Sequence, residues 1–164
     1  MENKVKRQLY LLDGMIKECQ ECPLYRNGHI KPYWTEHSRY VIMSEQLTGK
    51  ADSLLWELMG ENGFKKEQFL IINKINCLSD DTTNPSHVEK CQKWLDMYIN
   101  IIMPLRGIMF GKYLHENSTL FLMRVNNLYT PIIPIVKSVT PKFATYNDEG
   151  RKLLEQSILK FKLM

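Results

Sequence analysis

The sequence lacks the features that mark several common classes of protein. No uninterrupted apolar run is long enough to cross a bilayer. The opening stretch, MENKVKRQLYLLDG, has charge but neither a long apolar segment nor a small-residue cleavage site, so it does not resemble a signal peptide. There is no internal repeat, low-complexity tract or block of like charge. We therefore expect a chain of the reducing cytosol, with no membrane partner, in which disulfides are rare.

The length and net charge of the chain indicate how many domains it forms and which partners suit it. With 164 residues, the chain is long enough to form one domain, residues 1–164, around a real core. The 22 basic and 18 acidic residues leave a formal charge of +4. This mild surplus is compatible with a nucleic-acid partner, but it is also the ordinary balance of a solvated surface.

Apolar residues recur at helical spacing in four segments. In the first, Val5, Leu9 and Leu12 follow one another at steps of three and four, with Lys and Arg between them. Ser86, with Glu89 three residues later, has the form of a capping box, which predicts that the third helix begins at Ser86. The predicted helices cover residues 3–18, 51–60, 86–103 and 148–163.

Short apolar runs rich in β-branched residues predict the strands, at residues 39–43, 69–75, 107–110, 120–125 and 132–136. Helices that alternate with such strands favour a three-layer α/β/α sandwich with a mostly parallel central sheet of about four strands. Sites in such sheets lie beyond the carboxyl ends of the strands. The segments of interest are therefore Ser44–Thr48, Asn73–Cys77, Gly111–Lys112 and Lys137–Lys142.

The four cysteines constrain the chemistry most tightly: Cys19, Cys22, Cys77 and Cys91. Three interpretations compete. They can be small apolar core residues, ligands of zinc, although zinc ribbons usually show two C-x2-C steps, or ligands of an iron–sulfur cluster, which tolerates irregular spacing. His29 and His37 fall in a loop, and we expect them to be surface side chains rather than ligands.

Taken together, these segments resemble the family 4 uracil-DNA glycosylases, the iron–sulfur branch of that superfamily. The resemblance runs from about residue 15 to residue 162, with the same order and spacing of segments. It is carried by CQECPLYR (19–26), IINKINC (71–77), NPSHVEKC (84–91), FGKY (110–113) and SVTP (138–141). It implies that the four cysteines hold a [4Fe–4S] cluster, with zinc as the alternative cofactor, and that DNA is the partner.

The resemblance also implies a reaction site, but three of its parts are altered. The Gly-Glu-Ala-Pro-Gly turn that supports water activation in the family corresponds to Ser44–Thr48, where only Glu45 is kept. The loop with a Pro-Phe pair that stacks on the flipped base is missing after Gly49. A His-Pro pair is replaced by Thr140-Pro141, and a threonine cannot become cationic. Asn73 stands at the position whose amide reads the uracil edge.

The candidate catalytic residues are therefore Glu45, Asn73 and Thr140, each with a structural alternative. Glu45 can be a leftover carboxylate, Asn73 can cap a turn, and Thr140 can be purely structural. Losing one preorganised donor to developing charge typically lowers a rate by about 100- to 1,000-fold. Three lysines near strand ends could meet phosphates: Lys112, Lys137 and Lys142.

Three functions follow as hypotheses. The first is a DNA-interacting, cluster-containing member of the superfamily with impaired or lost base excision. The second is an active glycosylase that releases uracil or a modified base from a rearranged site. The third is a non-enzymatic module that binds a protein partner through a flattened cleft. So compact a form would suit a mobile element or a virus, in which case the chain would work in the host cytoplasm.

Overall fold

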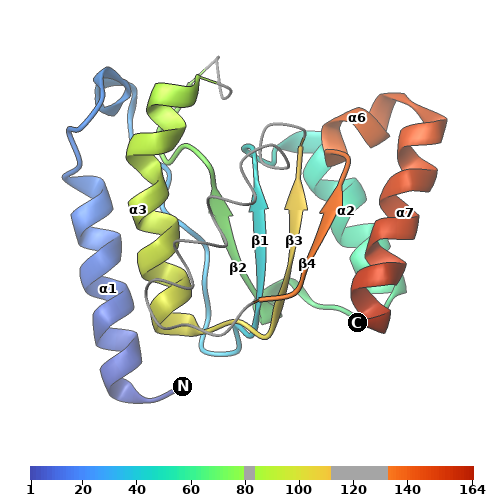
Figure 1. Ribbon diagram of the computed structural model, residues 1–164, viewed down its shortest axis with the longest axis horizontal. Coiled ribbons are helices and arrows are strands. Elements are labelled where there is room, and N and C mark those ends of the chain that lie inside the picture. The colour runs from blue at the N-terminus through green and yellow to red at the C-terminus, as the bar shows by residue number, and fades with distance from the viewer. Residues whose placement is uncertain (80–83, 112–132) are drawn as a thin grey trace.

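The computed structural model of the chain describes residues 1–79, 84–111 and 133–164, and it has the predicted α/β/α architecture (Figure 1). Four parallel strands form the central sheet: β1 (Tyr40–Ser44), β2 (Phe69–Asn73), β3 (Arg106–Phe110) and β4 (Ile135–Ser138). Their order is β2-β1-β3-β4. All neighbouring pairs are parallel, so the carboxyl ends of the four strands lie at one end of the sheet.

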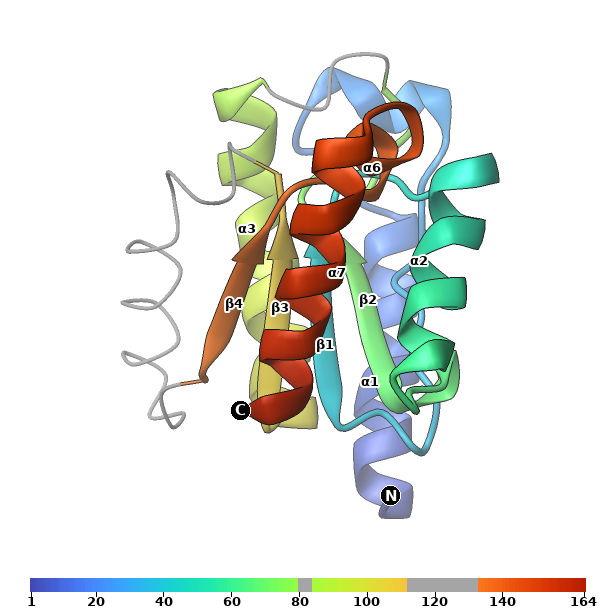
Figure 2. The same cartoon turned by 90° about the vertical axis from the view of Figure 1, so that its right-hand side faces the viewer.

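Helices cover both faces of this sheet (Figures 1 and 2). On one face lie α1 (Asn3–Lys17) and α3 (Pro85–Ile102), which contact each other. On the other lie α2 (Gly49–Glu61), α6 (Pro141–Tyr146) and α7 (Asp148–Leu163). Two short 3-10 turns complete the described elements, η1 (Pro23–Asn27) and η2 (Lys66–Gln68).

Each face has its own hydrophobic core because successive residues of a strand point to opposite sides. On β1, Val41 and Met43 pack toward α1 and α3, whereas Ile42 packs toward α2 and α7. The side chains of Leu9 in α1 and Phe161 in α7 are completely buried. Strands with both faces covered read as continuous apolar runs, which is why the sequence predicts them without alternation.

The core between α1, α3 and the sheet contains a buried carboxylate. Asp13 of α1 accepts hydrogen bonds from the indole N–H of Trp34, at 3.1 and 3.2 Å, and from the Tyr98 hydroxyl of α3, at 2.5 Å. The Lys31 ammonium lies 3.6 Å from the same carboxylate. Burial and the neighbouring Asp13 charge raise the pKa of Tyr98 well above its usual value. These contacts tie α1 to α3 at the middle of the molecule.

The predicted elements agree with the structure in type, with small shifts at their ends. The terminal helix has the predicted bounds, 148–163, and β2 ends two residues earlier than predicted. The capping box at Ser86 is wrong: α3 begins at Pro85, and the Asn84 side chain accepts the Ser86 N–H at 3.0 Å. Proline suits the first helical position because it has no N–H to satisfy there.

One further difference concerns the second half of the chain. The short helix α6 was not predicted from the sequence. The strand predicted at 120–125 lies outside the described residues, as does the first residue of the run predicted at 132–136. Among the residues that the structure describes, no helix combines the length and apolar character needed to span a membrane.

Candidate metal centre and candidate active site

The four cysteines come from three separate segments that the fold brings to one place. Cys19 and Cys22 lie between α1 and η1, Cys77 follows β2, and Cys91 lies in the first half of α3. All four line one hollow, which measures about 300 Å³ when its opening to solvent is included. We call it the cysteine hollow. Its other lining residues are Ile16, Glu21, Tyr25, His29, Asn76, Lys90 and Trp94.

Backbone pairing explains why the distant segments meet. The chain after η1 runs antiparallel to the chain after β2, with a bridge between His29 and Cys77. The N–H of Ile30 donates to the Asn76 carbonyl at 2.8 Å, and the N–H of Leu78 donates to the Gly28 carbonyl at 3.0 Å. This short ladder fixes the N-terminal cysteine step beside the end of β2.

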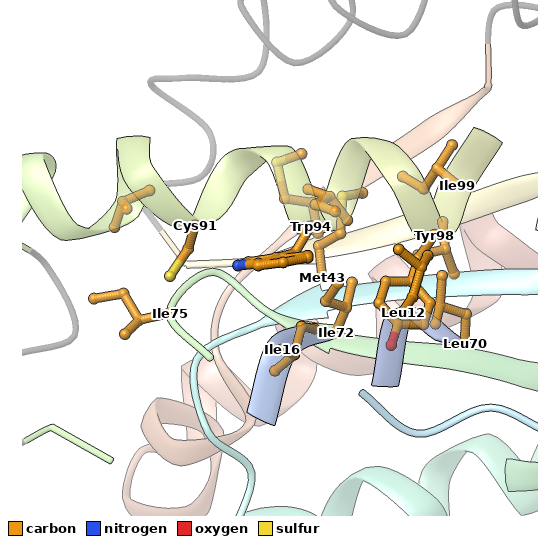
Figure 3. Close-up of a cluster of buried hydrophobic side chains, with 14 of the residues drawn as sticks. Leu12, Ile16, Met43, Leu70, Ile72, Ile75, Cys91, Trp94, Tyr98 and Ile99 are labelled. Atoms are coloured by element: carbon orange, nitrogen blue, oxygen red, sulfur yellow. The ribbon is translucent and has the colours of Figure 1, made fainter. Parts of the chain in front are cut away.

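The thiols are sheltered from water. Cys22, Cys77 and Cys91 are buried, Cys19 is half-buried, and none of them forms a disulfide. In Figure 3, Cys91 and Trp94 project from the same side of α3, toward Ile75 and Ile16. The hollow is therefore closed by apolar side chains on its inner side, which is the environment that excludes solvent from a metal centre.

Burial and mutual proximity change the acidity of these thiols. Burial raises the pKa of Cys77 to about 11, and the other three cysteines add to that effect. Burial also raises the pKa of Cys91, while a hydrogen bond from the Asn76 backbone N–H opposes the change. Metal binding must then displace protons from these sulfurs, because thiolates rather than thiols are the ligands.

A single metal ion and a cluster place different demands on the four cysteines. Within 1–79, 84–111 and 133–164, no group of three or more His, Cys, Asp or Glu side chains is arranged to hold one metal ion. Structural zinc needs four donors at bonding distance from one point. In a four-iron cluster each thiolate binds a different iron atom, so the sulfurs surround a larger space. The four cysteines that line the hollow are the residues that would hold either group.

The first candidate catalytic residue, Glu45, directly follows β1. Its carboxylate lies 2.9 Å from the ammonium of Lys74, which follows β2, the neighbouring strand. The Lys74 side chain is only 1% exposed, whereas that of Glu45 is 32% exposed. A buried ammonium strongly favours a nearby carboxylate, so Glu45 is held as the counter-ion of Lys74.

Thr140, the second candidate, lies close to Glu45 across Gly111. Gly111 has a φ of 100°, and a Cβ there would lie 3.3 Å from the Thr140 methyl group and 3.8 Å from a Glu45 carboxylate oxygen. The turn therefore requires glycine. The Thr140 hydroxyl accepts the Phe143 N–H at 3.1 Å and so caps α6. This contact is the structural role that the sequence left open.

Asn73, the third candidate, is the last residue of β2 and pairs in register with Ser44. It is half-buried, and no described residue exchanges a hydrogen bond with its side-chain amide. Neither Asn73 nor Thr140 lines the groove in which Glu45 lies. That groove measures about 1150 Å³ with its opening included, and we call it the polar groove. Its lining residues are Glu45, Gln46, Thr48, Gly49, Lys50, Ala51, Ser79, Lys142, Thr145 and Tyr146.

A family model for the uracil DNA glycosylase superfamily matches residues 33–161 of the chain. The chain belongs to the uracil DNA glycosylase superfamily. The match begins after Cys22, so membership does not depend on the N-terminal cysteine step. No curated protein was found to match the chain.

Only four residues separate the end of β1 from the start of α2 at Gly49. Lys142 and Lys50 line the groove, Lys137 is exposed on β4, and Lys112 lies outside the described residues. The first residues of α2, Gly49 to Ala51, also line the groove, and backbone N–H groups at the N-terminus of a helix favour anions.

Three residues of the two sites were not predicted from the sequence: His29, Lys74 and Asn76. His29 is half-buried in the cysteine hollow, with its Nε2 2.8 Å from the Cys19 carbonyl oxygen, so the prediction of a surface side chain is wrong. Lys74 was not singled out, although a lysine directly after a buried strand, next to Asn73, was a signal. Asn76 gave no signal beyond its place before Cys77.

Proposed function

We propose that this superfamily member binds DNA, carries a [4Fe–4S] cluster on Cys19, Cys22, Cys77 and Cys91, and has impaired or lost base excision. The observation that carries the loss of excision is the ion pair between Glu45 and Lys74. A carboxylate that activates water must be free to accept a proton. Here it serves as the counter-ion of a buried ammonium instead.

Support for the cluster comes from the cysteine hollow. Its four thiols come from three segments: the turn between α1 and η1, the end of β2, and α3. They are largely buried, and none of them forms a disulfide bond. A cluster bound there would act as a clamp between the N-terminal step and α3. The apolar side chains of Ile16 and Trp94 would exclude water from the bound cluster.

Support for DNA binding comes from superfamily membership and from the polar groove. Lys50 and Lys142 place two cations beside the N-terminus of α2. Both features attract phosphate without reading sequence. Asn73, at the adjacent strand end, has an amide that offers one donor and one acceptor to a base edge.

The test is a paired assay on iron-replete protein. Binding to single- and double-stranded oligonucleotides is measured across a salt series, and uracil release from the same labelled oligonucleotides is followed with the wild type and with Glu45→Ala. We expect salt-dependent binding and equal background release from both proteins. Release by the wild type that Glu45→Ala abolishes would instead establish an active glycosylase with a rearranged site. Absence of DNA binding would leave the protein-interaction module as the better hypothesis.

A further inference from the structure

Asn76 is the residue of the cysteine hollow that the proposed function leaves unexplained. It is only 2% exposed, yet neither the oxygen nor the nitrogen of its side-chain amide has a hydrogen-bond partner in the described structure. Burying an amide without partners is costly, and the large majority of buried polar side chains in proteins are paired. The described residues therefore leave the side-chain amide of Asn76 without the hydrogen-bond partner that a buried amide needs.

The backbone of Asn76, in contrast, is fully used. Its N–H donates to the Cys91 sulfur, and its carbonyl accepts the Ile30 N–H at 2.8 Å. The residue is thus fixed between two of the three segments that supply cysteines, directly before Cys77. This fixed backbone holds the side chain within the wall of the hollow, where it cannot reach bulk water.

The neighbouring groups define what could satisfy the amide. The wall of the hollow contains the four thiols and apolar side chains such as Ile16 and Trp94. It also contains polar side chains, but none of them has a hydrogen bond to the Asn76 amide: Glu21, Tyr25, His29 and Lys90. An asparagine amide has two N–H donors and one acceptor oxygen. Protonated thiols are weak partners, whereas thiolate and sulfide sulfurs carry negative charge and accept hydrogen bonds more strongly. The N–H donors of the Asn76 amide would therefore bind best to the negatively charged sulfur atoms of a metal centre.

We propose that the Asn76 side-chain amide donates a hydrogen bond to a sulfur atom of the iron–sulfur cluster, either a cysteine thiolate or a sulfide, and thereby raises the reduction potential of the cluster. Hydrogen bonds to the sulfurs stabilise the more negatively charged, reduced state and are known to set the potentials of such centres. Asn76 is a positioning residue and not a ligand. The inference rests on the proposed function, because it presupposes the cluster.

The first test compares Asn76→Leu with Asn73→Leu by spectroelectrochemical titration. Leucine has the same branched arrangement of heavy atoms as asparagine and removes both donors. Asn73 lies three residues earlier in the same segment but does not line the hollow, so Asn73→Leu is the matched control. We expect both variants to keep wild-type iron. We expect Asn76→Leu alone to lower the midpoint potential, with about a tenfold change in the reduced-to-oxidised ratio, equivalent to about 59 mV for one electron.

The second test needs no folded variant. Wild-type protein is prepared with ¹⁵N only in the side-chain amides of asparagine, and the reduced cluster is examined by pulsed EPR. We expect a ¹⁵N coupling from one nearby amide. An iron-replete wild type without that coupling, or an Asn76→Leu protein with wild-type iron and potential, would overturn the role of Asn76 and leave the proposed function standing. Wild-type protein without iron would overturn the proposed function itself.

Discussion

The segments that line the cysteine hollow and the polar groove lie at the same end of the sheet (Figure 1), but the fold builds the two sites differently. The hollow lies on the α1 and α3 face, is lined by four thiols among apolar side chains, and is held by backbone pairing between distant segments. The groove lies between the start of α2 and α6, is open and polar, and contains a carboxylate already paired with a lysine.

This difference indicates that the fold depends more on the residues of the hollow than on those of the groove. Every thiol of the hollow comes from a segment that packs against the core, so a change there propagates into α1 and α3. The groove is formed by side chains at strand ends and in a short turn, which can change with little effect on packing. We therefore expect variants of the hollow to affect folding, and variants of the exposed groove lysines, Lys50 and Lys142, to affect charge and DNA contact.

The largest effect is expected at Cys91. Cys91→Ser removes one ligand from a buried position, so we expect loss of iron and destabilisation of the native state by several kilocalories per mole, since binding energy at a structural metal centre is folding energy. Iron content and chemical denaturation measure both. Ala144→Ser places a hydroxyl at a buried position on the opposite face of the sheet and should retain iron. If the two variants contained the same amount of iron, Cys91 would not be a ligand of the cluster.

A smaller effect, with a definite asymmetry, is expected at the ion pair of the polar groove. Glu45→Gln replaces the carboxylate beside the buried Lys74 ammonium by a neutral amide and should lower the free energy of unfolding by about 1–3 kcal/mol. Lys74→Met leaves only the half-exposed Glu45, which water can solvate, and should be less destabilising. Urea denaturation of both variants gives the comparison. If Lys74→Met were instead the more destabilising variant, Glu45 would not serve mainly as the counter-ion of Lys74.

Much of this architecture could be predicted from the sequence, and the exceptions have physical causes. The strands and the terminal helix follow from local patterns of apolar residues, which is why the terminal helix has its predicted bounds. The start of α3 was misplaced because Asn84-Pro85 and Ser86-Glu89 both resemble helix starts, and only the structure selects the first.

The site residues divide in the same way. The convergence of the cysteines followed from resemblance, because no local pattern brings Cys19 beside Cys77. The roles of Lys74 and His29 depend on contacts between segments far apart in the sequence, such as Lys74 with Glu45. No spacing rule predicts such contacts, and the sequence analysis accordingly missed both residues.

The Asp13 contacts offer a way to separate folding of the α1 and α3 layer from cluster binding. Tyr98→Phe removes the hydroxyl that donates to the buried carboxylate and should cost about 1–2 kcal/mol of stability. Because Tyr98 does not line the cysteine hollow, the variant should keep its iron. Thermal denaturation with an iron assay tests this. Loss of iron from Tyr98→Phe would mean that the two halves of this layer are coupled more tightly than the contacts indicate.

The smallest effect is expected for the groove lysines in DNA binding. Lys50→Glu and Lys142→Glu should each weaken binding to every oligonucleotide alike and reduce the salt slope by about one, as expected for loss of a phosphate contact. Lys4→Glu, an equal change of charge on an exposed residue of α1, is the control. Equal weakening by all three variants would assign the effect to net charge and not to the groove.

We propose above all that the four thiols from distant segments of this fold hold an iron–sulfur cluster. The most direct measurement is the visible absorption spectrum of anaerobically purified protein, combined with iron and acid-labile sulfide assays. The account predicts a brown protein with about four iron atoms and about four sulfide ions per chain, both lost in Cys77→Ala. Colourless, folded protein without iron or sulfide would contradict it.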